Sequence, residues 1–147
     1  MFGHSLLYLS LAALAGLTMA VQGSINSVLG KKIGLVETTL FVHLTATVIL
    51  VIILFFTFNQ GILNLLRQVP WYLYLGGFLG VVITYTVAIS IPRLGVAVAT
   101  TAIIAAQVLT AAIIDHFGFF GLEEAPFNWL KLLGVFFLAI GVRLLLG

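Results

Sequence analysis

The chain has 147 residues, of which 63% are hydrophobic and only 7% are charged, and its formal net charge is +2. Soluble domains average about 25% charged residues, so this composition predicts a small integral membrane domain in the lipid bilayer. The small net charge gives no reason to expect a nucleic-acid partner. The absence of cysteine excludes disulfides and thiolate metal sites.

Long stretches of the chain contain no charged residue, and about 20 apolar residues in a helix cross the hydrocarbon core of a bilayer. We therefore predict one all-α transmembrane domain over residues 1–147. Its five helices are expected in chain order at residues 6–29, 38–58, 70–91, 95–116 and 127–147. The last helix carries Lys131 and Arg143, which can both extend to the surfaces if it spans. The alternative is a partly buried helix held by its neighbours.

Five spans place the two termini on opposite sides of the membrane. Lys31, Lys32, Arg93 and Arg143 then share one side, and Arg67 and Lys131 share the other. This bias favours a cytoplasmic C-terminus only weakly, because the positive-inside rule depends on the difference between the two sides. The sequence is therefore compatible with dual topology, in which the chain inserts in both orientations.

Small residues recur on single faces of the predicted helices, and such faces let membrane helices approach closely. The predicted packing positions are Gly16, Ala20, Ser24, Gly76, Gly80, Gly134 and Gly141. The alternative is that glycine and alanine are simply common in membrane helices.

Polar side chains inside the bilayer must find partners or face a water-filled cavity. Gln22 and Asn26 follow Thr18 at intervals of four residues, so all three share one face of the first helix. We predict a solute cavity lined by Gln22, Asn26, His43, Tyr85 and Gln107. The alternative is that these groups only form hydrogen bonds between helices. His43 is either a proton relay or a neutral histidine near the interface.

Enzymatic chemistry is not expected from this sequence. Ser24 and His43 lie on different helices with no third member of a triad, and no metal-ligand cluster or phosphate loop occurs. We therefore expect no catalytic residue, no metal and no cofactor. No carboxylate lies in the middle of a span, where a cation-for-proton exchanger usually carries one. Asp115 ends the fourth helix and is expected at the surface.

The second half of the chain resembles a known family. IPRLGVAVATTAIIAAQVLTAAIIDHFGFFG followed by LLGVFFLAIGVRLLL is similar to the closing helix pair of the drug/metabolite transporter superfamily, and MAVQGSIN in the first helix resembles its five-helix YdcZ-type branch. The resemblance implies half of a ten-helix inverted-repeat transporter in the inner membrane. Such a half would pair antiparallel, as a homodimer or as a heterodimer with a close paralogue.

The resemblance also bears on the substrate. The small multidrug resistance proteins, which are more distantly similar, carry a Glu in the first helix, whereas this chain has Gln22 and Asn26 in the comparable region. Neutral amides cannot exchange protons, so this difference favours a neutral, polar or zwitterionic solute, or a facilitated pathway. We expect a secondary transporter, an exporter of a small polar organic solute, with a site near the midplane between two copies. The alternatives are a non-transporting membrane packing or interaction protein and a narrow passive channel.

Overall fold

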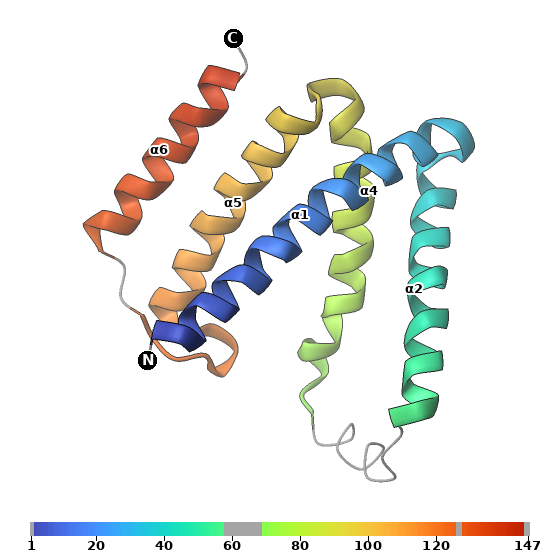
Figure 1. The fold of residues 1–147 in the computed structure, drawn as a ribbon, viewed down its shortest axis with the longest axis horizontal. Helices are drawn as coiled ribbons and strands as arrows, with labels where there is room; N and C mark the ends of the chain where they lie inside the picture. The colour runs from blue at the N-terminus through green and yellow to red at the C-terminus, as the bar shows by residue number, and fades with distance from the viewer. Residues whose placement is uncertain (1, 58–68, 126–127, 146–147) are drawn as a thin grey trace. The chain divides into compact units, whose positions relative to one another are not determined.

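A computed structural model describes residues 2–57, 69–125 and 128–145 of the chain. In these ranges the chain forms helices and no strands. The long helices are α1 (Phe2–Ile33), α2 (Leu35–Thr57), α4 (Gly76–Leu94), α5 (Val96–Phe117) and α6 (Trp129–Leu145), as Figure 1 shows. Two short 3-10 helices, Trp71–Leu75 and Phe119–Gly121, precede α4 and follow α5. The prediction of an all-α membrane fold is confirmed.

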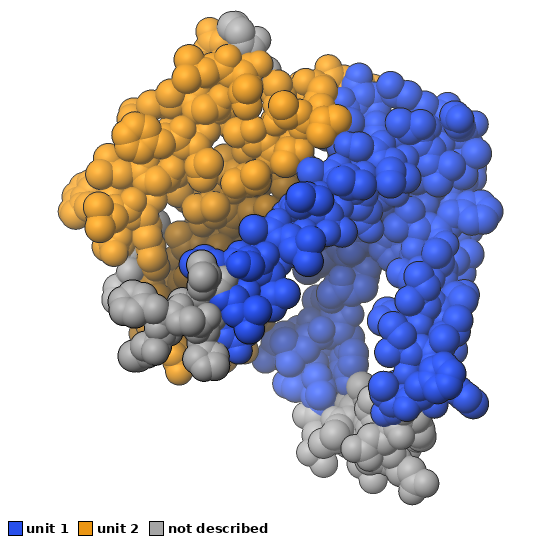
Figure 2. Space-filling view, viewed as in Figure 1, with its two compact units in different colours: residues 1–92 blue, residues 93–147 orange. Residues whose placement is uncertain are grey.

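The helices form two compact units, residues 1–92 and residues 93–147, which Figure 2 colours separately. The first unit contains α1, α2 and nearly all of α4, and the second contains α5 and α6. The predicted helix ends at residues 58, 127 and 147 lie outside the described residues.

Four helical stretches are long and apolar enough to cross a membrane: Leu7–Ile33, Leu35–Thr57, Trp71–Leu94 and Val96–Phe117. Their large apolar side chains are mostly exposed, as expected for helices that face lipid. The described part of α6 has 17 residues and is therefore about 26 Å long. The described chain is thus a multi-pass membrane protein, and a membrane-spanning α6 stays a prediction.

The turn between α1 and α2 is built around Gly34. α1 continues through Lys31 and Lys32, because cations in the last turn of a helix interact favourably with its dipole. It ends where Gly34 adopts a φ of +103°, a left-handed conformation that suits glycine. Glu37 then lies in the first turn of α2, where a negative charge is favourable.

The first unit is held together by small residues near this turn. At Gly23, α1 approaches α4 so closely that an added Cβ would lie 2.9 Å from Val87 Cγ1 and 3.1 Å from Ile91 Cδ1. The other buried residues of this unit are Asn26, Ser27, Thr38, Thr39, Ala88 and Ile91. The Thr38 and Thr39 hydroxyls donate to carbonyls one turn earlier, at 2.7 and 2.8 Å, so their burial leaves no hydroxyl hydrogen unpaired.

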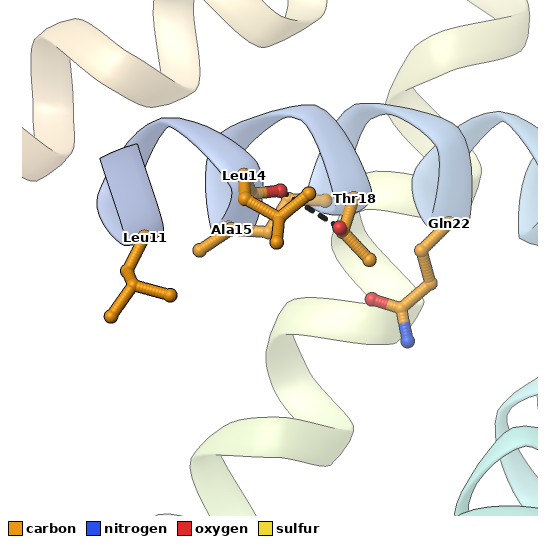
Figure 3. A pocket seen from close by; sticks show the side chains of 6 residues that line it. Leu11, Leu14, Ala15, Thr18 and Gln22 are labelled. Carbon is orange, nitrogen blue, oxygen red and sulfur yellow. Dashed lines mark hydrogen bonds between the residues drawn. The ribbon is translucent and has the colours of Figure 1, made fainter. Parts of the chain in front are cut away.

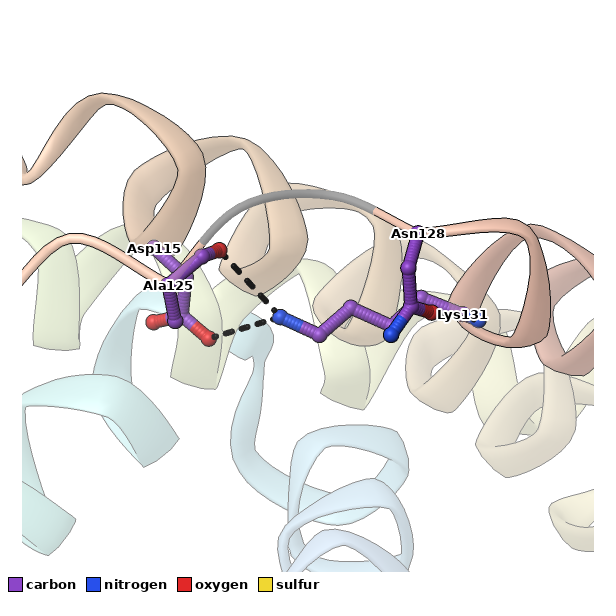
Figure 4. Close-up of polar contacts among 4 residues, drawn as sticks. All are labelled: Asp115, Ala125, Asn128 and Lys131. Carbon is purple, nitrogen blue, oxygen red and sulfur yellow. Dashed lines mark hydrogen bonds and ion pairs between the residues drawn. The ribbon is translucent and has the colours of Figure 1, made fainter.

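In the second unit a polar clasp joins the end of α5 to the start of α6 (Figure 4). The Lys131 ammonium lies 3.9 Å from Asp115 Oδ2 and donates to the Ala125 carbonyl at 3.3 Å. The Ala125 N–H donates in turn to the Asp115 carbonyl at 2.8 Å. Asn128 Oδ1 accepts the Lys131 backbone N–H at 2.9 Å, an N-terminal cap for α6. These contacts link the end of α5 to the start of α6.

Candidate functional site

The candidate site is a cavity of about 650 Å³ between α1 and α2. The two helices meet at the Gly34 turn and diverge from it, as Figure 1 shows. The lining residues are Gln22, Ile25, Asn26, Leu29 and Ile33 from α1, and Phe41, Val42, Thr45, Ala46 and Ile49 from α2. A volume of this size lies within the range of small-molecule sites, about 300–1,000 Å³.

Asn26 is the polar group set most deeply in this cavity. Its side chain is only 6% exposed, yet within the described part of the chain its amide forms no hydrogen bond. No fully enclosed side-chain nitrogen or oxygen of the described residues lacks a partner. The Asn26 amide atoms are therefore open to the cavity, where a bound molecule could reach them.

Gln22 lies one helical turn before Asn26 and is exposed. It lines the α1–α2 cavity and also a second hollow of about 470 Å³ along α1, formed with Leu11, Leu14, Ala15, Thr18 and Met19. Figure 3 shows Thr18 and Gln22 on one side of α1, with the Thr18 hydroxyl bonded to the Leu14 carbonyl at 2.8 Å. The polar face expected from the spacing of Thr18, Gln22 and Asn26 thus runs along both hollows.

His43 lies on a different side of α2. Its Nδ1 is 2.8 Å from the Thr39 carbonyl, and because a carbonyl only accepts, this nitrogen carries the proton. Its Nε2 is directed toward α4, where a Cβ added to Gly80 would lie 3.3 Å away. His43 is absent from the cavity lining. The structure therefore does not bring His43 together with Gln22 and Asn26.

The two other predicted site residues lie on α4 and α5. Tyr85 lies on α4 with 37% of its surface exposed and does not line the cavity. Gln107 lies near the middle of α5, in the second unit. Binding roles for His43, Tyr85 and Gln107 stay predictions.

Sequence reasoning did not identify the wall that α2 contributes. Phe41, Val42, Thr45, Ala46 and Ile49 follow the spacing of a single helix face. That spacing was visible in the sequence, but it does not distinguish a cavity wall from a lipid-facing surface, since both are apolar. The structure identifies this face as a cavity wall because it places Asn26 and Gln22 in the same lining.

Most of the predicted packing glycines have open space beside them. A Cβ added at Gly16, Gly76, Gly134 or Gly141 would meet no atom within 4 Å, whereas one at Gly80 meets His43. Ala20 and Ser24 are partly buried, and the Ser24 hydroxyl donates to the Ala20 carbonyl at 2.8 Å. A role for these positions in contacts with a second copy stays a prediction.

Comparisons with known proteins identify the family. A family model described as "Putative inner membrane exporter, YdcZ" matches residues 7–144. Comparison with curated proteins and with solved structures returns no match. Because the family match spans nearly the whole chain, this multi-pass inner-membrane protein belongs to the YdcZ family, which is described as a family of exporters.

Proposed function

We propose that this protein exports a small organic solute that binds in the α1–α2 cavity. The observation that carries the proposal is the Asn26 amide, which is buried, makes no hydrogen bond within the described chain and opens into the cavity. Because the amide atoms are open to the cavity, a bound solute could donate a hydrogen bond to the Asn26 oxygen and accept one from its NH₂ group. The description of the family as exporters supports the proposal that the bound solute is transported.

The depth of the two amides suits a transport site. At 1.5 Å per residue, Gln22 lies about 14 Å from Lys31 along α1, close to half the thickness of a 30 Å hydrocarbon core. Asn26 lies about 8 Å from Lys31 by the same rise. A solute held between these groups would sit from the midplane toward the Lys31 end of the helix.

An antiparallel dimer would complete the site. The cavity is formed by only two helices of one copy and has an open side. Gly16 and Gly76 have open space where the backbone of a second copy could approach. Two copies related as inverted repeats would place two such cavities near one midplane, and rocking of the copies would expose the solute to each side in turn.

A transport assay with Asn26→Leu tests this function. Proteoliposomes would be loaded with a mixture of small organic molecules, both charged and uncharged, and efflux would be measured by mass spectrometry. We expect saturable efflux of at least one solute with the wild-type chain and its loss in Asn26→Leu. Thr47→Val is the control, because Thr47 lies on α2 outside the cavity lining. Efflux that rises linearly with concentration would indicate a passive channel, and efflux absent for every solute would indicate a packing protein.

A further inference from the structure

The chemistry of the cavity wall restricts what it can bind. Of the described residues, the ten that line the cavity include no Asp, Glu, Lys, Arg or His. Most are aliphatic or aromatic, and the polar members are Gln22, Asn26 and Thr45. An ion that bound against this wall would give up part of its water shell and would meet no opposite charge in the lining, which is unfavourable.

The polar members offer a defined set of hydrogen bonds. The Asn26 amide presents an acceptor oxygen and a donor NH₂ side by side, and both are unused within the described chain. Gln22 presents the same pair one helical turn away. The Thr45 hydroxyl donates to the Phe41 carbonyl at 2.8 Å, so toward the cavity it can only accept. A group that donates and accepts at adjacent atoms would pair with the oxygen of Asn26 and with one of its two N–H donors.

The remaining wall favours an apolar body attached to that group. Ala46 is the smallest side chain in the lining, and it lies on α2 one helical turn after Val42 and next to Thr45. The α2 face from Phe41 to Ile49 otherwise offers aromatic and aliphatic surface. Burial of an apolar body against this surface is favourable in proportion to the area removed from water.

We infer that the cavity selects an uncharged amphiphile, a molecule with an amide-type head that pairs with Asn26 and Gln22 and an apolar body that lies against α2. This inference rests on the proposed function and names its substrate class. It narrows the expected small polar solute in two ways: it excludes ions and zwitterions, and it requires an apolar part.

Three probes of matched size test the class: 4-phenylbutanamide, 4-phenylbutanoate and 4-phenylbutylammonium. All three contain a 3-phenylpropyl group, and they differ in the head group, which is a neutral amide, an anionic carboxylate or a cationic ammonium. Equilibrium binding would be measured at pH 7 to the wild-type protein in lipid nanodiscs, with empty nanodiscs subtracted. We expect the amide to bind about tenfold or more tightly than either ion. Equal or tighter binding of an ion, or no binding of the amide at millimolar concentration, would overturn the inference.

Substitutions test separately the amides that bind the head group and the α2 surface that binds the apolar body. Asn26→Leu should lose the preference for the amide, and Asn26→Asp should shift the preference toward the ammonium, because a buried carboxylate attracts a cation. Ala46→Leu should weaken the binding of 4-phenylbutanamide, because the larger side chain fills part of the cavity. Ala13→Leu is its control, since Ala13 is exposed on α1 and lines neither hollow. An unchanged preference in both Asn26 variants would contradict the assigned head site.

Export and the ligand class can be tested independently of each other. If the amide binds with the expected preference and no solute shows saturable efflux, the ligand class stands and export is wrong. If efflux is saturable and depends on Asn26 but the ammonium binds as tightly as the amide, export stands and the ligand class is wrong.

Discussion

The polar side chains within the helices of the first unit differ in how their hydrogen-bonding groups are used. Thr38 and Thr39 direct their hydroxyls to carbonyls of their own helix, and His43 does the same with Nδ1. Such groups are satisfied without a partner from outside. The Asn26 amide is buried and makes no such bond in the described chain, so it has hydrogen-bonding capacity left for a ligand.

Substitutions of two similar threonines on α2 test whether the solute binds in the cavity. Thr45 and Thr47 are both exposed on α2 and donate to carbonyls one turn earlier, at 2.8 and 2.7 Å, but only Thr45 lines the cavity. Thr45→Val should weaken solute binding by a few-fold, because one acceptor is lost, whereas Thr47→Val should not. Both should leave the unfolding temperature nearly unchanged. A similar loss of binding in both variants would argue against this placement of the site.

At the scale of helices, the charge pattern predicts where the long helices lie but not which faces meet. In a lipid-facing protein the outer and inner surfaces are both apolar, so the sequence carries little periodic signal for burial. The shared face of Gln22 and Asn26 follows from helix geometry alone. That α2 faces these amides, while His43 faces Gly80 on α4, depends on helix packing that this spacing does not encode.

Substitutions at two glycines of α1 distinguish helix packing within the chain from packing between two copies. Gly23→Leu should destabilise the fold by about 1–3 kcal/mol, since Val87 and Ile91 occupy the space a side chain needs. A Cβ added at Gly16 would meet no atom within 4 Å, so Gly16→Leu should change the stability of the single chain little. It should instead lower the yield of dimers. Unfolding and cross-linking of purified variants measure the two effects, and equal stability of both variants would contradict the close α1–α4 contact.

The α5–α6 clasp should contribute only modestly to stability. Asp115 and Lys131 are 3.9 Å apart and their side chains are 48% and 35% exposed, so water screens much of their attraction. Lys131→Met should therefore cost less than about 1 kcal/mol, as for other exposed ion pairs. A denaturation experiment on the purified variant measures this cost. A loss of several kcal/mol would show that the hydrogen bond to Ala125 matters far more than the ion pair.

For the whole molecule, the weak bias of its basic residues predicts insertion in both orientations. A reporter fused to the C-terminus should be detected on both sides of the inner membrane. Two lysines added to the loop after α2 should shift the two populations, because short basic loops tend to stay in the cytoplasm. Detection of the reporter on one side alone would rule out an antiparallel homodimer and favour pairing with a paralogue of opposite orientation.

The central claim is that the α1–α2 cavity is the path of the solute, and a single cysteine tests it most directly. The natural chain contains no cysteine, so Ala46→Cys creates a unique thiol in the cavity lining and leaves Asn26 and Gln22 in place. A polar maleimide should label this thiol in membranes, and 4-phenylbutanamide should protect it. Val48→Cys, on the exposed surface of α2 outside the lining, should stay unlabelled. If Ala46→Cys is as unreactive as Val48→Cys, or if 4-phenylbutanamide gives it no protection, the α1–α2 cavity is not the path of the solute.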